Sequence, residues 1–375
     1  MRRAYVFRLR PTARQHAALA ACVDAHRELY NAALQERRDA WSHASKTRIR
    51  YEDQSAQLTG MRAVRPDQAV WSFSSQQATL RRLNKAFAGF FGRVKAGQTP
   101  GYPRFKGKAR FDSVEWPKDG DGARWLPEQR RVYLQGIGQV KVYLHRQVAG
   151  RVKTIQIKRQ GRRWMLVLSC DDVPTNPLPV TGRQVGIDVG IVSFATTSDG
   201  QHVENPRWAR ASAARLAAAQ QRLARAKTRS INRDLRRQTV AARHRKIANQ
   251  RKDFHHKQAR ELAARYDLIV VEDLKIANML RRAKPVAEPA NPGHYLPNGA
   301  RAKPGLNRSI SDAGWGQFVS ILRAKAEEAG RAWIEVDPRH TSDRCEACGH
   351  VARANRVTQA RNILRAGLAH HAHAA

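Results

Sequence analysis

Two short apolar runs carry the strongest structural signal in this chain: Val185-Gly186-Ile187-Asp188-Val189-Gly190 and Leu268-Ile269-Val270-Val271-Glu272-Asp273-Leu274. Hydrophobic residues flank Asp188 and precede Glu272, which predicts two buried strands with an acid at the end of each. Burying an unpaired carboxylate is costly, and a divalent cation held between two carboxylates offsets that cost. The pair therefore predicts a metal site formed by Asp188 and Glu272.

Each acid also has a purely structural interpretation. Asp188 lies between Gly186 and Gly190, a pattern that is equally typical of the start of a hairpin turn. Glu272 alone is a weaker signal. Only the two acids taken together favour a metal site over ordinary turn and strand-end residues.

The charge of the chain predicts a polyanionic partner. Its 375 residues include 69 Lys and Arg against 31 Asp and Glu, a net charge of +38 spread along the whole length. Such a surplus is the electrostatic signature of nucleic-acid binding. No apolar run reaches the roughly 18 residues that a membrane span requires, and the charged N-terminus lacks a signal-peptide pattern. We expect a cytoplasmic, nucleoid-associated protein without a membrane partner.

The most basic segment is a predicted helical hairpin over residues 206–266. Between Arg207 and Arg260 it holds seventeen Lys or Arg and only two acids. An ordinary solvated hairpin is the alternative, but so many like charges repel one another unless phosphates neutralise them. We predict contacts with the nucleic-acid backbone from the following residues: Arg222, Arg225, Lys227, Arg229, Arg236, Arg237, Arg243, Arg245, Lys246, Arg251, Lys252 and Lys257.

The N-terminal half is predicted to be a small antiparallel β-domain, residues 1–10 and 97–172, with a helical insert at residues 11–96. Apolar residues at helical spacing predict the insert. Alternating apolar residues predict the strands, over residues 4–10, 131–134, 139–144, 152–158 and 164–169.

The C-terminal half begins after a predicted linker over residues 173–180, where closely spaced prolines exclude a helix or a central strand. Residues 181–340 mix strands with helices, which predicts an α/β domain with a loop over 284–307 and a helix over 312–329. Two acids on strands separated by helices, in so basic a chain, match an RNase H-like nuclease, which binds two Mg²⁺ ions about 4 Å apart.

Seven motifs in order along the chain resemble those of TnpB, the transposon-encoded OrfB-type transposase family related to the type V CRISPR effectors. The resemblance extends from residue 4 almost to the C-terminus. The motifs are Phe7-Arg8-Leu9-Arg10-Pro11-Thr12, Leu29-Tyr30-Asn31, Gly101-Tyr102-Pro103-Arg104-Phe105-Lys106, Gly186-Ile187-Asp188-Val189-Gly190, Val271-Glu272-Asp273-Leu274, Ser309-Ile310-Ser311-Asp312-Ala313-Gly314-Trp315 and Thr341-Ser342-Asp343-Arg344-Cys345-Glu346-Ala347-Cys348-Gly349-His350.

The resemblance implies an RNA-guided, Mg²⁺-dependent DNA endonuclease with a multidomain α+β fold. A wedge-like antiparallel β-domain with a helical recognition insert would precede an RNase H-like (RuvC) α/β nuclease domain with an incomplete zinc-ribbon insert. Asp188 and Glu272 would be the first and second catalytic carboxylates and Mg²⁺ ligands. A transposon-derived guide RNA would pair with a double-stranded DNA target, and the basic hairpin would line the nucleic-acid channel.

The chain departs from the family pattern near its C-terminus. TnpB-like proteins carry a second CxxC and then a third catalytic Asp, but here no Cys follows Cys348 and no acid follows Glu346. Residues 341–360 therefore resemble a truncated zinc ribbon, followed by a helix and tail at residues 361–375. Cys345 and Cys348 supply two of the four ligands that structural zinc needs. Candidates for the others are His340, His350, His370, His371 and His373.

The C-terminal tail cannot supply a third carboxylate, because no acid follows Glu346. The remaining candidates are Asp312, Asp337 and Asp343. Asp312 is expected to cap a helix that begins near Ala313, and Asp337 follows a predicted strand. We therefore expect impaired cleavage, with a nuclease-inactive, RNA-guided DNA-binding protein as the alternative. A basic RNA-binding protein without a DNA target is a third hypothesis, which leaves the acid pair unexplained.

Overall fold

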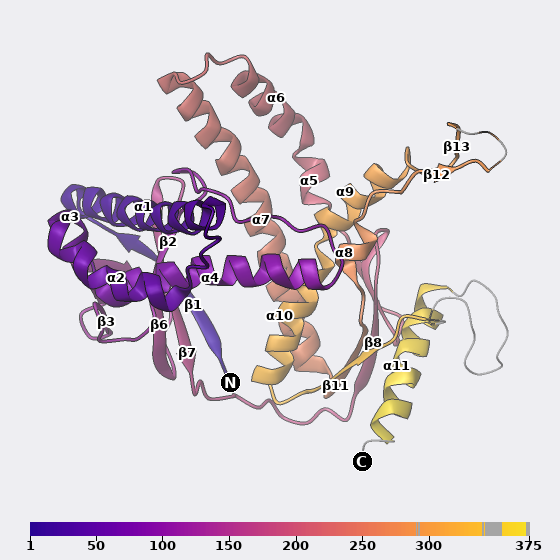
Figure 1. Cartoon of the computed structure of the whole chain (residues 1–375). Helices are drawn as coiled ribbons and strands as arrows, with labels where there is room; N and C mark the ends of the chain where they lie inside the picture. The colour runs from indigo at the N-terminus through magenta and orange to yellow at the C-terminus, as the bar shows by residue number, and fades with distance from the viewer. Residues whose placement is uncertain (290, 292, 340, 342–354, 373–375) are drawn as a thin grey trace. The chain divides into compact units, whose positions relative to one another are not determined.

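The computed structural model describes residues 1–289, 291, 293–339, 341 and 355–372, in two compact units (Figure 1). Unit 1 is Met1–Pro174 and unit 2 is Thr175–Ala375. The boundary falls within the proline-rich segment, where residues 173–183 form neither helix nor strand. None of the helices in the described part of the chain has both the length and the apolar character needed to cross a lipid bilayer.

Unit 1, all of whose residues are described, packs helices against a seven-stranded antiparallel sheet of order β2-β6-β7-β1-β5-β4-β3. The helices connect β1 to the rest of the sheet. The elements are β1 (Arg3–Arg10), α1 (Ala13–Ser42), α2 (Tyr51–Val64), α3 (Pro66–Ala69), α4 (Phe73–Lys95), β2 (Ser113–Trp116), β3 (Ala123–Leu126), β4 (Arg131–Leu134), β5 (Gly138–Tyr143), β6 (Arg151–Gln160) and β7 (Arg163–Asp171).

Local sequence explains the first elements of unit 1. Tyr5, Phe7 and Leu9 alternate with exposed residues in β1, so one face of this central strand enters the core. Thr12 then starts α1 with a capping box, because its hydroxyl accepts from the Gln15 amide and the Gln15 side chain accepts from the Thr12 amide. The strands predicted from alternation are confirmed as β1 and β4–β7.

Unit 2 contains a five-stranded sheet of order β10-β9-β8-β11-β14. β9 is antiparallel to both of its neighbours, β8 and β10, whereas β11 is parallel to both β8 and β14. The described elements are β8 (Gln184–Val189), β9 (Ser193–Thr197), β10 (His202–Glu204), α5 (Trp208–Ala211), α6 (Ala213–Ala224), α7 (Ile231–Arg265), β11 (Leu268–Glu272), α8 (Ile276–Met279), β12 (Val286–Ala287), β13 (Tyr295–Leu296), α9 (Lys303–Ala313), α10 (Trp315–Glu328), β14 (Ala332–Val336) and α11 (Arg356–Ala372).

The two faces of β11 meet different helices. Ile269 and Val271 pack with side chains of α7 and α10, whereas the alternate residues Leu268 and Val270 pack with Ile363 of α11. Figure 1 shows α11 running beside β8 and β11, which it contacts. The sheet is therefore covered on both faces, which explains why its central strands are continuously apolar.

The region around residue 312 differs from the prediction. The expected helix over 312–329 begins at Trp315, because Gly314 adopts a left-handed conformation that ends α9 and separates it from α10. Asp312 therefore lies in the last turn of α9 and does not cap the following helix. The expected loop over 284–307 ends earlier as well, since α9 starts at Lys303.

A buried histidine makes the stability of unit 1 depend on pH. His26 of α1 is 1% exposed; its Nδ1 donates to the Cys22 carbonyl at 2.8 Å, and its Nε2 lies 2.8 Å from the Ser75 hydroxyl. Burial lowers the pKa of His26 to about 4, against the smaller opposing effect of the Cys22 hydrogen bond. As the pH falls below about 6.5, the unfolded chain therefore binds a proton that the folded chain excludes.

We expect His26 to remove about 2 kcal/mol of unfolding free energy from unit 1 between about pH 7 and pH 5. Urea denaturation of the full chain at both pH values measures this loss. The His26→Gln variant should lack that part of the pH dependence, and His43→Gln, an exposed change at the end of the same helix, should retain it. Identical pH dependence in the wild type and His26→Gln would contradict the prediction.

Candidate active site

The structure brings Asp188 and Glu272 together on adjacent strands. β8 and β11 are parallel, with Ile187 beside Val271 in the last recorded pair, so the next step of the register places Asp188 beside Glu272. Both acids lie on the face of Val270, which packs against α11. The pKa of Glu272 responds to the charge of Asp188, which agrees with this proximity.

Two glycines let α11 approach this face. A Cβ atom at Gly186 would lie 2.1 Å from the Ala360 carbonyl oxygen and 2.6 Å from the Leu364 amide nitrogen. At Gly190 it would lie 2.8 Å from Nη1 of Arg356. Only a residue without a side chain fits at either position, and the resulting contact brings the first residue of α11, Arg356, to the acid pair.

Arg356 forms an ion pair with Asp188. Its Nη1 donates to Oδ2 of Asp188 at 2.6 Å. Asp188 is 5% exposed. Burial raises the pKa of Asp188, and the hydrogen bond and positive charge of Arg356 partly oppose the rise. The guanidinium therefore provides the opposite charge that a buried carboxylate needs.

Glu272 is held by Thr341, a buried residue. The Thr341 hydroxyl oxygen lies 2.5 Å from Oε1 of Glu272 and 3.0 Å from the Pro338 carbonyl oxygen. Burial raises the pKa of Glu272 and the negative charge of Asp188 adds to the rise, whereas Thr341 and Arg356 lower it. The acid pair thus carries less negative charge at a given pH than two exposed carboxylates would.

The candidates for a third acid have other roles where the structure describes them. The Asp312 carboxylate accepts from the backbone amides of Ala209 and Arg210, at 2.8 and 3.2 Å. It therefore caps the start of α5 and not α10, the next helix in the chain. Asp337 is exposed and accepts from the Arg339 amide. Asp343 lies outside the described residues.

The described donor set does not fit a two-metal centre. Among the described residues no group of three or more His, Cys, Asp or Glu side chains is placed to hold a metal ion. Mg²⁺ sites in nucleic-acid enzymes use several carboxylate oxygens, whereas here one of two carboxylates is paired with Arg356. The predicted zinc ligands Cys345 and Cys348, like His340, His350 and His373, lie outside the described residues.

The predicted nucleic-acid contacts lie on α6, on α7 and in the turn between them. Most of the twelve side chains are exposed, but Arg245 and Arg251 are half-buried. Arg251 donates to the Ser311 carbonyl at 2.9 Å and so joins α7 to α9. The structure thus leaves most of this basic surface open to a ligand, while Arg251 also serves the fold.

Sequence reasoning missed Arg356. It is the first residue of the helix that follows the incomplete zinc-ribbon segment, next to Asn355. One signal could have pointed to it. The third catalytic Asp expected from the resemblance is absent from the C-terminal region, and the last helix begins there with a basic residue. The pattern did not predict that the guanidinium would reach Asp188, 168 residues earlier.

Family models match three parts of the chain. The model described as "Probable transposase" matches residues 167–283, "Cas12f1-like, TNB domain" matches residues 315–374, and "Helix-turn-helix domain" matches residues 1–46. In this structure the last of these ranges contains strand β1 and one continuous helix, α1.

Known proteins resemble the chain over nearly its whole length. "Putative RNA-guided DNA endonuclease InsQ" of Escherichia coli strain K12 is 30% identical over 96% of this chain and 86% of its own length. A Streptomyces pristinaespiralis protein described as "Putative RNA-guided DNA endonuclease" is 31% identical, over 98% and 90%. The cryo-EM structure of the Cas12f1-sgRNA-target DNA complex contains a similar fold: TM-score 0.53 and 13% identity, over 93% of this chain and 82% of that one.

We expect Gly186→Ala to destabilise unit 2 by at least about 1–3 kcal/mol, because the new methyl group would overlap the backbone of α11. Thermal denaturation and limited proteolysis of the C-terminal helix measure the effect. Gly305→Ala in α9 is the matched control, since its Cβ would meet no atom within 4 Å. Equal stability of the two variants would show that α11 does not pack on β8 as described.

We expect Mg²⁺ or Mn²⁺ not to raise the melting temperature of the wild type, because Arg356 is paired with Asp188 and prevents a cation from binding to the acid pair. Arg356→Gln should gain about 1–3 kcal/mol of cation-dependent stabilisation at saturating metal. The double variant Asp188→Ala/Arg356→Gln is the control and should lose that gain. A wild type that is stabilised as strongly as Arg356→Gln would argue against the assignment of Arg356.

Proposed function

The chain belongs to the TnpB family of transposon-encoded RNA-guided DNA endonucleases, and on this premise we propose that it is an RNA-guided DNA-binding protein with an impaired nuclease site. Its partners would be a transposon-derived guide RNA and a double-stranded DNA target. Base pairing by the guide would supply sequence specificity, while the protein would bind the backbone and a short motif beside the target. A DNA target also implies association with the nucleoid.

The sheet of unit 2 supports a RuvC-like domain within this proposal. Numbered along the chain, its strands lie in the order 3-2-1-4-5, with the fourth and fifth parallel to the first. The first and fourth strands are neighbours and each carries one acid, which supports an RNase H-like nuclease, where acids on neighbouring strands hold metal ions. Asp188 and Glu272 occupy those strands, and we assign them as the first and second catalytic carboxylates of the family site.

The remaining parts of the chain receive assignments on the same basis. The antiparallel sheet of unit 1 and the helices inserted after β1 support a wedge-like β-domain with a recognition insert. The assigned ranges are residues 1–10 and 97–172 for the wedge, 11–96 for the insert, 173–180 for the linker, 181–340 for the RuvC-like domain, 341–360 for the zinc-ribbon remnant and 361–375 for the C-terminal helix and tail.

The ion pair of Arg356 with Asp188 is the observation that supports impairment. In this class of nuclease, bound Mg²⁺ activates water and stabilises the leaving oxygen. A guanidinium remains protonated at any physiological pH, so it neutralises Asp188 without generating a nucleophile. One acid is paired with Arg356, and no third acid lies beside it among the described residues. The site is therefore suited to stabilising the domain rather than to cleaving DNA.

Binding does not depend on that site. The exposed basic side chains of α6 and α7 offer phosphate contacts that give affinity without sequence preference. α7 has 35 residues, which at 1.5 Å per residue extends about 50 Å, enough to follow more than one turn of a duplex. An intact binding surface beside an impaired nuclease site is the combination that we propose.

We expect the purified chain with its cognate guide RNA to bind a guide-matched DNA duplex more tightly than a scrambled one at the same salt, and to leave a matched plasmid uncut in Mg²⁺. Binding is measured by filter retention and cleavage by gel electrophoresis. Asp188→Ala should leave the plasmid uncut as well, since Arg356 already neutralises Asp188 in the wild type.

Each alternative outcome contradicts one part of the proposal. Guided cleavage by the wild type that Asp188→Ala abolishes would mean an active nuclease. Equal affinity for matched and scrambled duplexes would mean a basic RNA-binding protein, because purely electrostatic binding shows no such preference.

A further inference from the structure

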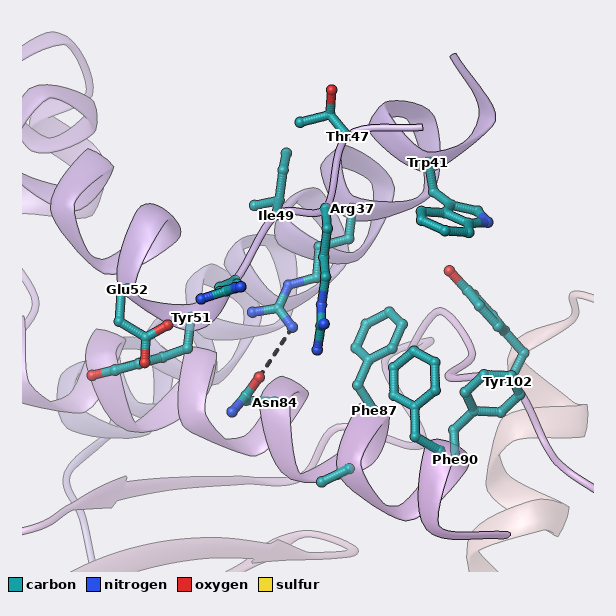
Figure 2. Close-up of a pocket in the computed structure, with 14 residues that line it drawn as sticks. Arg37, Trp41, Thr47, Ile49, Tyr51, Glu52, Asn84, Phe87, Phe90 and Tyr102 are labelled. Atoms are coloured by element: carbon teal, nitrogen blue, oxygen red, sulfur yellow. Dashed lines mark hydrogen bonds between the residues drawn. The ribbon is translucent and has the colours of Figure 1, made fainter. Parts of the chain in front are cut away.

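An aromatic pocket of 610 Å³ lies in unit 1, between α1, the start of α2 and α4. Figure 2 shows its lining side chains, with Trp41 and Tyr102 at one end and Tyr51 and Glu52 at the other. The volume lies within the usual range of small-ligand sites. The aromatic residues of its wall are Trp41, Tyr51, Phe87, Phe90, Phe91 and Tyr102.

Four of these rings contact one another: Phe87, Phe90, Phe91 and Tyr102. Tyr102 meets Phe87 and Phe90 edge-on, with ring centroids 5.6 and 5.4 Å apart. Yet Trp41, Phe91 and Tyr102 are 56%, 53% and 43% exposed. Clustered aromatic exposure of this extent marks a binding surface, because scattered single residues are the normal case.

Arg37 provides an unpaired donor in the wall of this pocket. Its side chain is 8% exposed and lies over the Phe87 ring, with the guanidinium carbon 5.2 Å from the ring centroid. Nε donates to Gln54 and Nη1 to Asn84, at 2.8 and 3.2 Å, but the buried Nη2 has no hydrogen-bond partner. A buried unpaired guanidinium donor is costly, so Nη2 lacks an acceptor that a ligand can supply.

Two arginines at the edge of the pocket favour a negatively charged ligand. Arg48 and Arg50 line the pocket and are exposed, and neither side chain forms an ion pair with another residue in the described part of the chain. Glu52 is the one acid among the lining residues, so the rim is net positive. Aromatic faces, a buried donor and free cations together match a nucleotide, which has a flat base, a base carbonyl and a phosphate.

We propose that this pocket binds an unpaired nucleotide of single-stranded nucleic acid, with its base among the aromatic rings and its phosphate at Arg48 and Arg50. The base carbonyl would accept from Nη2 of Arg37. All of its lining residues belong to unit 1 and none is a member of the acid pair, so the proposal holds whether or not the chain cleaves DNA.

The test compares Trp41→Ala and Tyr102→Ala with Tyr133→Ala, a 41%-exposed tyrosine of β4 outside the pocket. Fluorescence anisotropy of the full chain measures affinity for a short single-stranded DNA, the same sequence as RNA, and the corresponding duplex. Each pocket variant should bind single strands about tenfold more weakly. The affinity of the pocket variants for the duplex should be unchanged, and Tyr133→Ala should bind all three ligands as the wild type does. If the pocket variants lose more affinity for one single strand, DNA or RNA, that strand is the source of the nucleotide.

An abasic strand separates base stacking from phosphate contact. Trp41→Ala should not weaken binding of an abasic oligonucleotide of equal length, whereas Arg48→Gln should lower the salt dependence of single-strand binding by about 0.7 in log–log slope. Equal losses for abasic and normal strands, equal losses for duplex and single strand, or no loss in either pocket variant would overturn the proposal. Unchanged circular dichroism of the variants confirms that they fold.

Discussion

The chemistry of unit 2 depends on how two carboxylates on the α11 face of its sheet are neutralised. Asp188 is almost fully buried and its neighbour Glu272 is half-buried, so their charges repel in a poorly solvated site. Either cations bind there or protons do. Arg356 meets this requirement from within the chain, and it can do so only because Gly186 lets the backbone of α11 lie directly on β8.

Local patterns predicted what local interactions determine. The continuous apolar runs became the central strands β8 and β11, and the alternation of Tyr5, Phe7 and Leu9 became β1. Those patterns could not reveal contacts between residues far apart in the chain. The cap that Asp312 provides to α5 spans 103 residues, and a favoured N-cap residue next to a helix looks the same whichever helix it caps.

Composition likewise predicted the positions of the basic helices, but it could not predict which of their arginines bind backbone carbonyls of the protein itself. Arg233 donates to the Leu223 and Ala226 carbonyls and ties the two arms of the hairpin together, and Arg251 joins α7 to α9. Such arginines satisfy helix-end carbonyls, so they are less available to phosphates than their exposed neighbours. The net charge of a segment predicts its partner, whereas the hydrogen bonds decide which residues are available to it.

An arginine at the acid pair explains how the sheet keeps its fold when no third carboxylate lies beside the pair among the described residues. Asp188 left without a cation would destabilise the sheet, because this almost fully buried carboxylate would lose its opposite charge. A guanidinium offers the positive charge and the directed donors that the carboxylates need, without the water-activating chemistry of a metal ion. Stability and cleavage thus make opposite demands on Asp188: the contact with Arg356 that keeps it stably buried also withholds its oxygen from a metal.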